Sequence, residues 1–207
     1  MSIAIIDYGM GNLRSVQKAF EFLGYEAQVT ENKEEIRKAD QVVLPGVGAF
    51  RDAIKTLQEK RLDEEIYRAV EDGKPFLGIC LGMHLIFEKS YEYGEYQGLG
   101  LLKGNIVKLP NTVKVPHIGW NSLKIEKRAP LFEGLPEEPY VYFVHSYHLE
   151  TDASVVSATT FYGKEIQVAA QNKNIYATQF HPEKSGNIGL KILKNFGGLK
   201  NENLSSD

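Results

Sequence analysis

The stretch "PFLGICLGMH", residues 75–84, predicts a buried strand that turns sharply into a helix. It holds Cys80, the one cysteine of the chain, between Gly78 and Gly82. Such a turn favours glycine, because residues there take a positive φ or approach other backbone closely. This is the pattern of a nucleophile elbow with cysteine in the place of serine. The start of the helix favours a thiolate, and the amide of Leu81 is positioned to stabilise an oxyanion.

A structural role for Cys80 is the alternative. A lone buried cysteine often behaves as a small hydrophobic residue. The flanking glycines add weight to a nucleophile without deciding between the two interpretations.

The residues before this stretch alternate between short apolar runs and helical patterns. Strands are predicted at residues 3–7, 26–30, 41–46 and 75–79. Helices lie between them, and another is predicted at 81–90. This alternation predicts an α/β fold, with a mainly parallel open sheet flanked by helices on both faces. Functional sites in such sheets lie at the carboxyl ends of the strands, which are Tyr8–Asn12, Gly46–Ala49 and Cys80.

The second half of the chain consists mostly of strand patterns separated by turn residues, with a closing helix at 187–197. The strands are predicted at residues 105–110, 121–127, 140–147, 154–163, 165–171 and 174–180. The sequence therefore predicts one domain over residues 1–200, in which an antiparallel strand extension follows the parallel core. Residues 201–207 are expected to form a polar tail.

Composition excludes several classes of protein. The 207 residues are 43% hydrophobic and carry a net charge of −3, which gives no general affinity for nucleic acid. The first residues have no basic n-region and no long apolar stretch, so no signal peptide is expected. No stretch of the sequence is apolar over a length that would span a membrane. A single cysteine forms no internal disulfide, which favours the reducing cytoplasm. The sequence has no Walker A pattern and no metal-type Cys/His cluster, so neither a cofactor nor a metal is expected.

A cysteine nucleophile needs a base, and the chain has five histidines. His181 follows the last predicted strand, and Pro182 prevents the strand from continuing. Glu183 lies two residues after His181, so in extended chain the two side chains point the same way. The carboxylate would then fix the imidazole tautomer. Cys80, His181 and Glu183 are therefore a candidate triad.

The segment "LPGVGAF", residues 44–50, follows the strand expected beside that of Cys80. A glycine-rich loop can turn its amides toward a ligand or an oxyanion. An ordinary strand–helix turn remains the alternative. The GxG spacing lacks the third glycine of a dinucleotide-binding fingerprint.

The motifs "GICLGM", "LPGVG" and "HPEKS", in this order, resemble those of the class I (triad) glutamine amidotransferases. "DYGMGN", "PHIGWN" and "YFVHSY" are similar to segments of one branch, the glutaminase subunits of imidazole glycerol phosphate synthases. The resemblance runs from the first strand to the last helix and implies a flavodoxin-like class I amidotransferase fold.

By this resemblance Cys80 is the nucleophile, His181 the general base and acid, and Glu183 the orienting carboxylate. Val47 of the "PGVG" loop and Leu81 of the elbow would supply the oxyanion amides. The loop is expected to rearrange in the active complex. The glutamine contacts implied are Gly46, Gly48, His84, Glu92, Ser146 and Tyr147. His84 departs from the family, which usually has Gln at this position, and a substrate-contacting His84 is expected to titrate between about pH 5 and 8.

The resemblance also implies a partner, a (β/α)₈-barrel cyclase that consumes the ammonia in a heterodimer. The residues expected at the docking surface are Asn12, His117, Trp120, Tyr142 and Lys184. The implied reaction is hydrolysis of L-glutamine through a thioester. The cyclase would then make imidazole glycerol phosphate and an aminoimidazole carboxamide ribotide in histidine biosynthesis.

Other functions stay open on the residues alone. One is a stand-alone cysteine hydrolase that uses Cys80 with another histidine, such as His84. A second is a binding module in which Cys80 is structural. A third is an amidotransferase subunit for anthranilate or pyridoxal phosphate synthesis, against which "PHIGWN" and "HPEKS" argue by resemblance.

Overall fold

The computed structural model describes residues 1–127, 129–152 and 154–201. The helices are α1 (Leu13–Phe22), α2 (Lys33–Lys38), α3 (Phe50–Glu59), α4 (Leu62–Glu71), α5 (Leu81–Ile86) and α6 (Gly186–Gly197), with short 3₁₀ turns at Pro130–Phe132 and Pro182–Lys184. The strands of the N-terminal half are β1 (Ser2–Ile6), β2 (Glu26–Thr30), β3 (Gln41–Gly46), β4 (Phe76–Cys80), β5 (Phe87–Ser90) and β6 (Tyr96–Gln97). Those that follow are β7 (Leu102–Lys108), β8 (His117–Ser122), β9 (Lys124–Ile125), β10 (Tyr140–His145), β11 (Tyr147–Glu150), β12 (Val156–Tyr162), β13 (Lys164–Asn172) and β14 (Ile175–Thr178).

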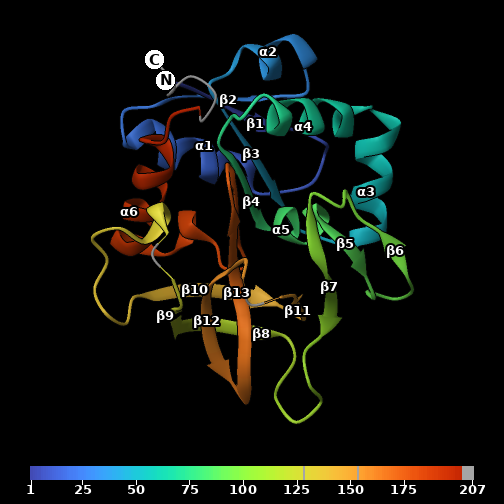
Figure 1. Ribbon diagram of the computed structural model, residues 1–207, viewed down its shortest axis with the longest axis vertical. Coiled ribbons are helices and arrows are strands. Elements are labelled where there is room, and N and C mark those ends of the chain that lie inside the picture. The colour runs from blue at the N-terminus through green and yellow to red at the C-terminus, as the bar shows by residue number, and fades with distance from the viewer. Residues whose placement is uncertain (128, 153, 202–207) are drawn as a thin grey trace.

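The large sheet has the strand order β2-β1-β3-β4-β14-β13-β11-β7-β5-β6. The first five strands of this order are parallel to one another. From β14 onward the β13, β11 and β7 pairings are antiparallel. The predicted fold class, a mainly parallel open sheet with an antiparallel extension, is therefore confirmed. Figure 1 shows the extension as the lower part of the molecule, below the helix-covered core.

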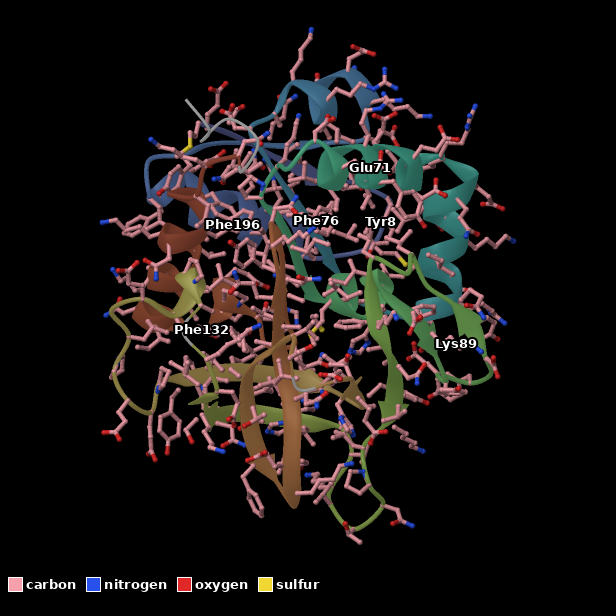
Figure 2. The ribbon with its side chains drawn as sticks, viewed as in Figure 1. Tyr8, Glu71, Phe76, Lys89, Phe132 and Phe196 are labelled. Carbon is pink, nitrogen blue, oxygen red and sulfur yellow. The ribbon has the colours of Figure 1, made fainter. Side chains whose placement is uncertain are left out.

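The core lies in two layers, one on each face of the parallel strands. Side chains alternate between faces along β1, so Ile3 and Ile5 join one layer and Ala4 and Ile6 join the other. Helices α1 and α6 cover the first layer, and α2, α3 and α4 cover the second. Figure 2 shows Phe76 and Phe196 within this interior, whereas Lys89 lies at the periphery.

The predicted helix at 81–90 is wrong in its second half. The structure ends α5 at Ile86, and β5 begins at once with Phe87. Backbone amides of residues 98–100 bond to carbonyls of residues 85–88, in place of a further helical turn. β5 is then paired on both edges, by β7 and β6, so long-range strand pairing overrides the local helical pattern.

The predicted strand at 140–147 is split by Ser146. β10 pairs with β8 in a separate small sheet, whereas β11 joins the large sheet beside β7. Residues 117–120, not predicted as a strand, form most of β8. Among the described residues, no helix combines the length and apolar character that crossing a membrane requires. Of the expected tail, residues 202–207 lie outside the described residues.

Candidate active site

Strand register brings three loops together at the carboxyl edge of the sheet. On one side of β4, Gly46 of β3 pairs with Cys80. On the other side, Thr178 of β14 pairs with Ile79. The segment ending in His181 therefore leaves the sheet beside the end of β4, although about a hundred residues separate the two strands in sequence.

Cys80 occupies a strained turn between β4 and α5. Its backbone has φ 55° and ψ −110°, which a residue with a side chain rarely adopts. A side chain at Gly82 would overlap the Leu44 carbonyl oxygen, and one at Gly78 would lie 2.8 Å from the Gly82 carbonyl oxygen. The two glycines are thus required by close packing of this turn. The thiol is 7% exposed, at the floor of a cavity.

His181 and Glu183 form a buried pair. The His181 Nδ1 and Glu183 Oε1 atoms are 2.8 Å apart, and both side chains are almost fully buried. The His181 backbone is held by its amide, which donates to Tyr142 O at 3.0 Å, and by its carbonyl, which accepts from Ser185 Oγ at 2.6 Å. The imidazole is therefore fixed from both the backbone and Nδ1.

The second nitrogen of the imidazole is left for the thiol. His181 Nε2 is buried and has no hydrogen bond of ordinary geometry, while the Cys80 side chain interacts with the ring. Burial by itself lowers the pKa of His181, but Cys80 and Glu183 outweigh it and raise this pKa to about 10. The arrangement therefore favours an imidazolium beside the sulfur.

A cavity of about 330 Å³ opens above Cys80. Its lining includes most of the residues predicted to contact substrate or an oxyanion, namely Val47, Gly48, Leu81, His84, Glu92, Ser146 and Tyr147. Gly46 lies beside it, with its Cα against the Tyr8 hydroxyl. A buried thiol beside a paired imidazole, at the wall of a cavity, suits nucleophilic attack on a carbonyl group.

The sequence matches the family model of glutamine amidotransferase class-I over residues 4–197. The chain belongs to the class-I glutamine amidotransferases. A protein from Caldanaerobacter subterraneus subsp. tengcongensis is 54% identical, covering 95% of this chain and 98% of its own length. Relatives from Aquifex aeolicus and Methanocaldococcus jannaschii are 54% and 51% identical, covering 95% and 94% of this chain and 96% and 97% of their own lengths. All three are named imidazole glycerol phosphate synthase subunit HisH.

Solved structures agree with the fold of this amidotransferase. PurLQS from Thermotoga maritima superposes with a TM-score of 0.75 at 20% identity, covering 94% of this chain and 96% of that one. A crystal structure described as a glutamine amidotransferase gives 0.74 at 22% identity, covering 94% and 98%. At such identities the likeness concerns the fold alone.

The expectation that His84 titrates between about pH 5 and 8 is wrong for this amidotransferase. Burial lowers the pKa of His84 to about 4, so the ring is neutral across that range. Its Nε2 lies 2.7 Å from Gln179 Oε1. The amide oxygen only accepts, so His84 Nε2 carries the proton and donates.

Glu92 has a contact that sequence reasoning did not foresee. Its Oε2 accepts from the backbone amide of Phe50 at 2.7 Å, at the start of α3. Burial raises the pKa of this carboxyl group. Glu92 thus ties the loop after Gly48 to the cavity.

Two further residues of the site were missed, Gln179 and Val144. Gln179 Nε2 and Val144 O each lie 4.0 Å from the Cys80 sulfur. Tyr8, which opens the predicted segment Tyr8–Asn12, interacts electrostatically with Cys80. Gln179 could have been found from the sequence, because it precedes His181 by two residues. In extended chain the side chains of two such residues face the same way.

The residues expected at a docking surface divide into two groups. Trp120 is 55% exposed and contacts the half-buried Tyr142 ring edge-on, at 6.1 Å between centroids. Asn12 and Lys184 are exposed as well. His117 is instead 3% exposed, stacked between Phe143 and Tyr162. Its side chain is therefore part of the interior and unavailable to a partner, because β8 turns alternate residues inward.

Proposed function

We propose that this chain is the glutaminase subunit of an imidazole glycerol phosphate synthase. The observation that carries the proposal is the placement of Cys80 beside an imidazole whose other nitrogen is held by Glu183, at the floor of a cavity. Relatives that are 54% identical over 95% of this chain are named imidazole glycerol phosphate synthase subunit HisH, which supports the choice of this synthase. A stand-alone hydrolase using His84 as base has less support, since His84 Nε2 is committed to Gln179.

In the proposed reaction the Cys80 thiolate attacks the side-chain carbonyl carbon of L-glutamine, and the carbonyl oxygen becomes an oxyanion. His181 Nε2 gives its proton to the leaving nitrogen, and ammonia departs as the C–N bond breaks, leaving a thioester. Water then attacks the thioester and passes a proton to His181. Breaking the C–S bond releases glutamate and restores the thiolate.

The oxyanion is assigned to two backbone amides. Leu81 follows the nucleophile directly, and Val47 belongs to the loop after β3 that pairs with β4 at Gly46 and Cys80. Both residues line the cavity. Amides aimed at the developing charge stabilise the transition state, and the Val47 amide would take this position when its loop rearranges in the complex.

The amino-acid end of glutamine is assigned to Glu92, Ser146 and Tyr147, which line the same cavity. Glu92 is the acidic member and would accept from the substrate ammonium group. Its bond to the Phe50 amide uses one carboxylate oxygen and leaves the other for this contact.

The proposed partner is a (β/α)₈-barrel cyclase in a cytoplasmic heterodimer. Ammonia released into water near pH 7 becomes mostly ammonium, which is not a nucleophile, so it must pass through a dry route to its acceptor. The exposed surface formed by Asn12, Trp120, Tyr142 and Lys184, here called the docking surface, is the proposed contact. The cyclase would use the ammonia to make imidazole glycerol phosphate and aminoimidazole carboxamide ribotide.

The test is Cys80→Ala in the complex assembled with the cyclase. Glutamine-dependent formation of imidazole glycerol phosphate is expected to fall by about 10⁴-fold or more, because the nucleophile is lost. Activity with added ammonium salts is expected to persist, since it bypasses this site. Loss of both activities would indicate a misfolded subunit, and retention of glutamine-dependent activity would contradict the nucleophile.

A further inference from the structure

Gln179 is a fully buried amide that the reaction proposed above does not use. It lies at the end of β14, two residues before His181, and its backbone amide donates to Val168 O at 2.8 Å. Its side chain connects two groups of the site. Oε1 accepts from His84 Nε2 at 2.7 Å, and Nε2 points to Cys80 Sγ at 4.0 Å.

His84 holds the oxygen of this amide. Gln179 Oε1 lies 2.7 Å from His84 Nε2 and can only accept, so in this arrangement Nε2 carries the proton. The NH₂ group of Gln179 faces the sulfur. A flipped amide would instead place its carbonyl oxygen against the sulfur, where it would repel a thiolate.

The sulfur has different partners in its two protonation states. A thiol can donate to Val144 O, which also lies 4.0 Å away. A thiolate has no proton to donate, and the same carbonyl oxygen repels it. The thiolate instead attracts N–H donors, and bonds to a charged acceptor are shorter and stronger than neutral ones.

We propose that Gln179 is a catalytic residue that donates a hydrogen bond to the Cys80 thiolate, and that His84 is the positioning residue that aims it. This inference rests on the proposed function, because it concerns the same nucleophile. It gives the sulfur a second stabilising group besides the His181 imidazolium, and it assigns His84 a role that does not require contact with substrate.

Other ionisable groups face this cluster and must stay constant in a test. His181 with Glu183 approaches the sulfur after β14, and Tyr8 approaches from the end of β1. Burial raises the pKa of Tyr8, so its hydroxyl stays protonated. His148 acts electrostatically on His84, and His84 in turn acts on His145. Burial lowers the pKa of both His145 and His148.

The single cysteine makes alkylation a clean probe. The full-length chain would be treated with iodoacetamide across about pH 5 to 10, and the rate at each pH gives the midpoint of thiolate formation. The wild-type midpoint is the reference for the variants. Gln179→Met keeps the length of the side chain and removes the donor. Its midpoint is expected about one pH unit higher, which means about tenfold slower alkylation on the acid side.

Gln41→Met is the matched control. Gln41 is also fully buried, and its amide donates to carbonyls of Phe196, Gly197 and Leu199 at the opposite end of β3 from Gly46. Its loss affects stability without touching the sulfur. The alkylation midpoint of Gln41→Met is expected to equal that of wild type.

His84 variants test the positioning step and remain usable if Gln179→Met fails to fold. His84→Ala is expected to raise the midpoint by less than Gln179→Met does. His84→Gln is expected to restore it, because an amide can donate to Gln179 Oε1. A midpoint of Gln179→Met or His84→Ala that coincides with that of wild type would overturn this inference alone. Retention of glutamine-dependent activity in Cys80→Ala would instead overturn the proposed nucleophile.

Discussion

At the scale of single residues, the charge on His181 decides the pH range of the reaction. Glu183 and Cys80 raise the pKa of this imidazole, so the ring keeps its proton well above neutral pH. Glu183→Gln removes a carboxylate that favours the charged ring, so the pKa of His181 falls, by about 1–3 units for a contact of this kind. The alkaline limb of kcat/KM for glutamine, measured in the complex, is therefore expected to move to lower pH.

The matching control for Glu183→Gln is the ammonium-dependent activity of the same complex, whose pH profile should not move. An alkaline limb at the wild-type position would remove Glu183 from the triad. The near-isosteric amide also keeps the shape of the buried site, so a shift reports charge and not packing.

At the scale of elements, the β4–α5 turn depends on the missing side chain of Gly82. A Cβ there overlaps the Leu44 carbonyl oxygen of the neighbouring strand, and backbone cannot move aside as a flexible side chain can. Gly82→Ala is expected to lower the free energy of unfolding by about 1–3 kcal/mol, as overpacking does, and to displace Cys80. Thermal unfolding and iodoacetamide labelling measure the two effects.

Gly198→Ala provides the comparison, because its Cβ would meet only atoms at ordinary contact distance and its φ is −81°. It should leave stability unchanged or raise it slightly. If Gly82→Ala behaved in the same way, close packing would not be the reason for glycine in this turn.

Features that local sequence patterns decide could be predicted, whereas features that depend on contacts between distant segments could not. Apolar runs separated by helical patterns predicted β1, β3 and β4 and the parallel core, because these strands are buried on both faces. The end of α5 and the existence of β8 were not predictable, since pairing with distant strands decides both. The glycines around Cys80 and the spacing of His181 and Glu183 predicted the candidate triad. The neutral state of His84 depends on burial and on Gln179, which no local pattern reveals.

At the scale of the whole molecule, the proposed docking surface is separate from the core. Trp120 is more than half exposed, so its removal costs the isolated subunit little stability. Trp120→Ala is expected to weaken binding to the barrel cyclase by about 2 kcal/mol or more if the ring is an anchor. Titration calorimetry with the cyclase would measure this. Phe22→Ala removes another exposed aromatic ring, at the far end of α1, and should leave the affinity unchanged; equal effects would place the contact elsewhere.

β14 follows the other strands in sequence, yet it lies between β4 and β13 in the sheet. The proposed active site can therefore form only late in synthesis of the chain. A ribosome-bound fragment that stops before residue 175 already contains the cysteine, yet it has neither the histidine nor the strand that carries it. Until then one edge of β4 stays open, and an open edge recruits other chains. With the proposed triad, ammonia release is therefore expected only after β14 has closed the sheet and His181 has been synthesised.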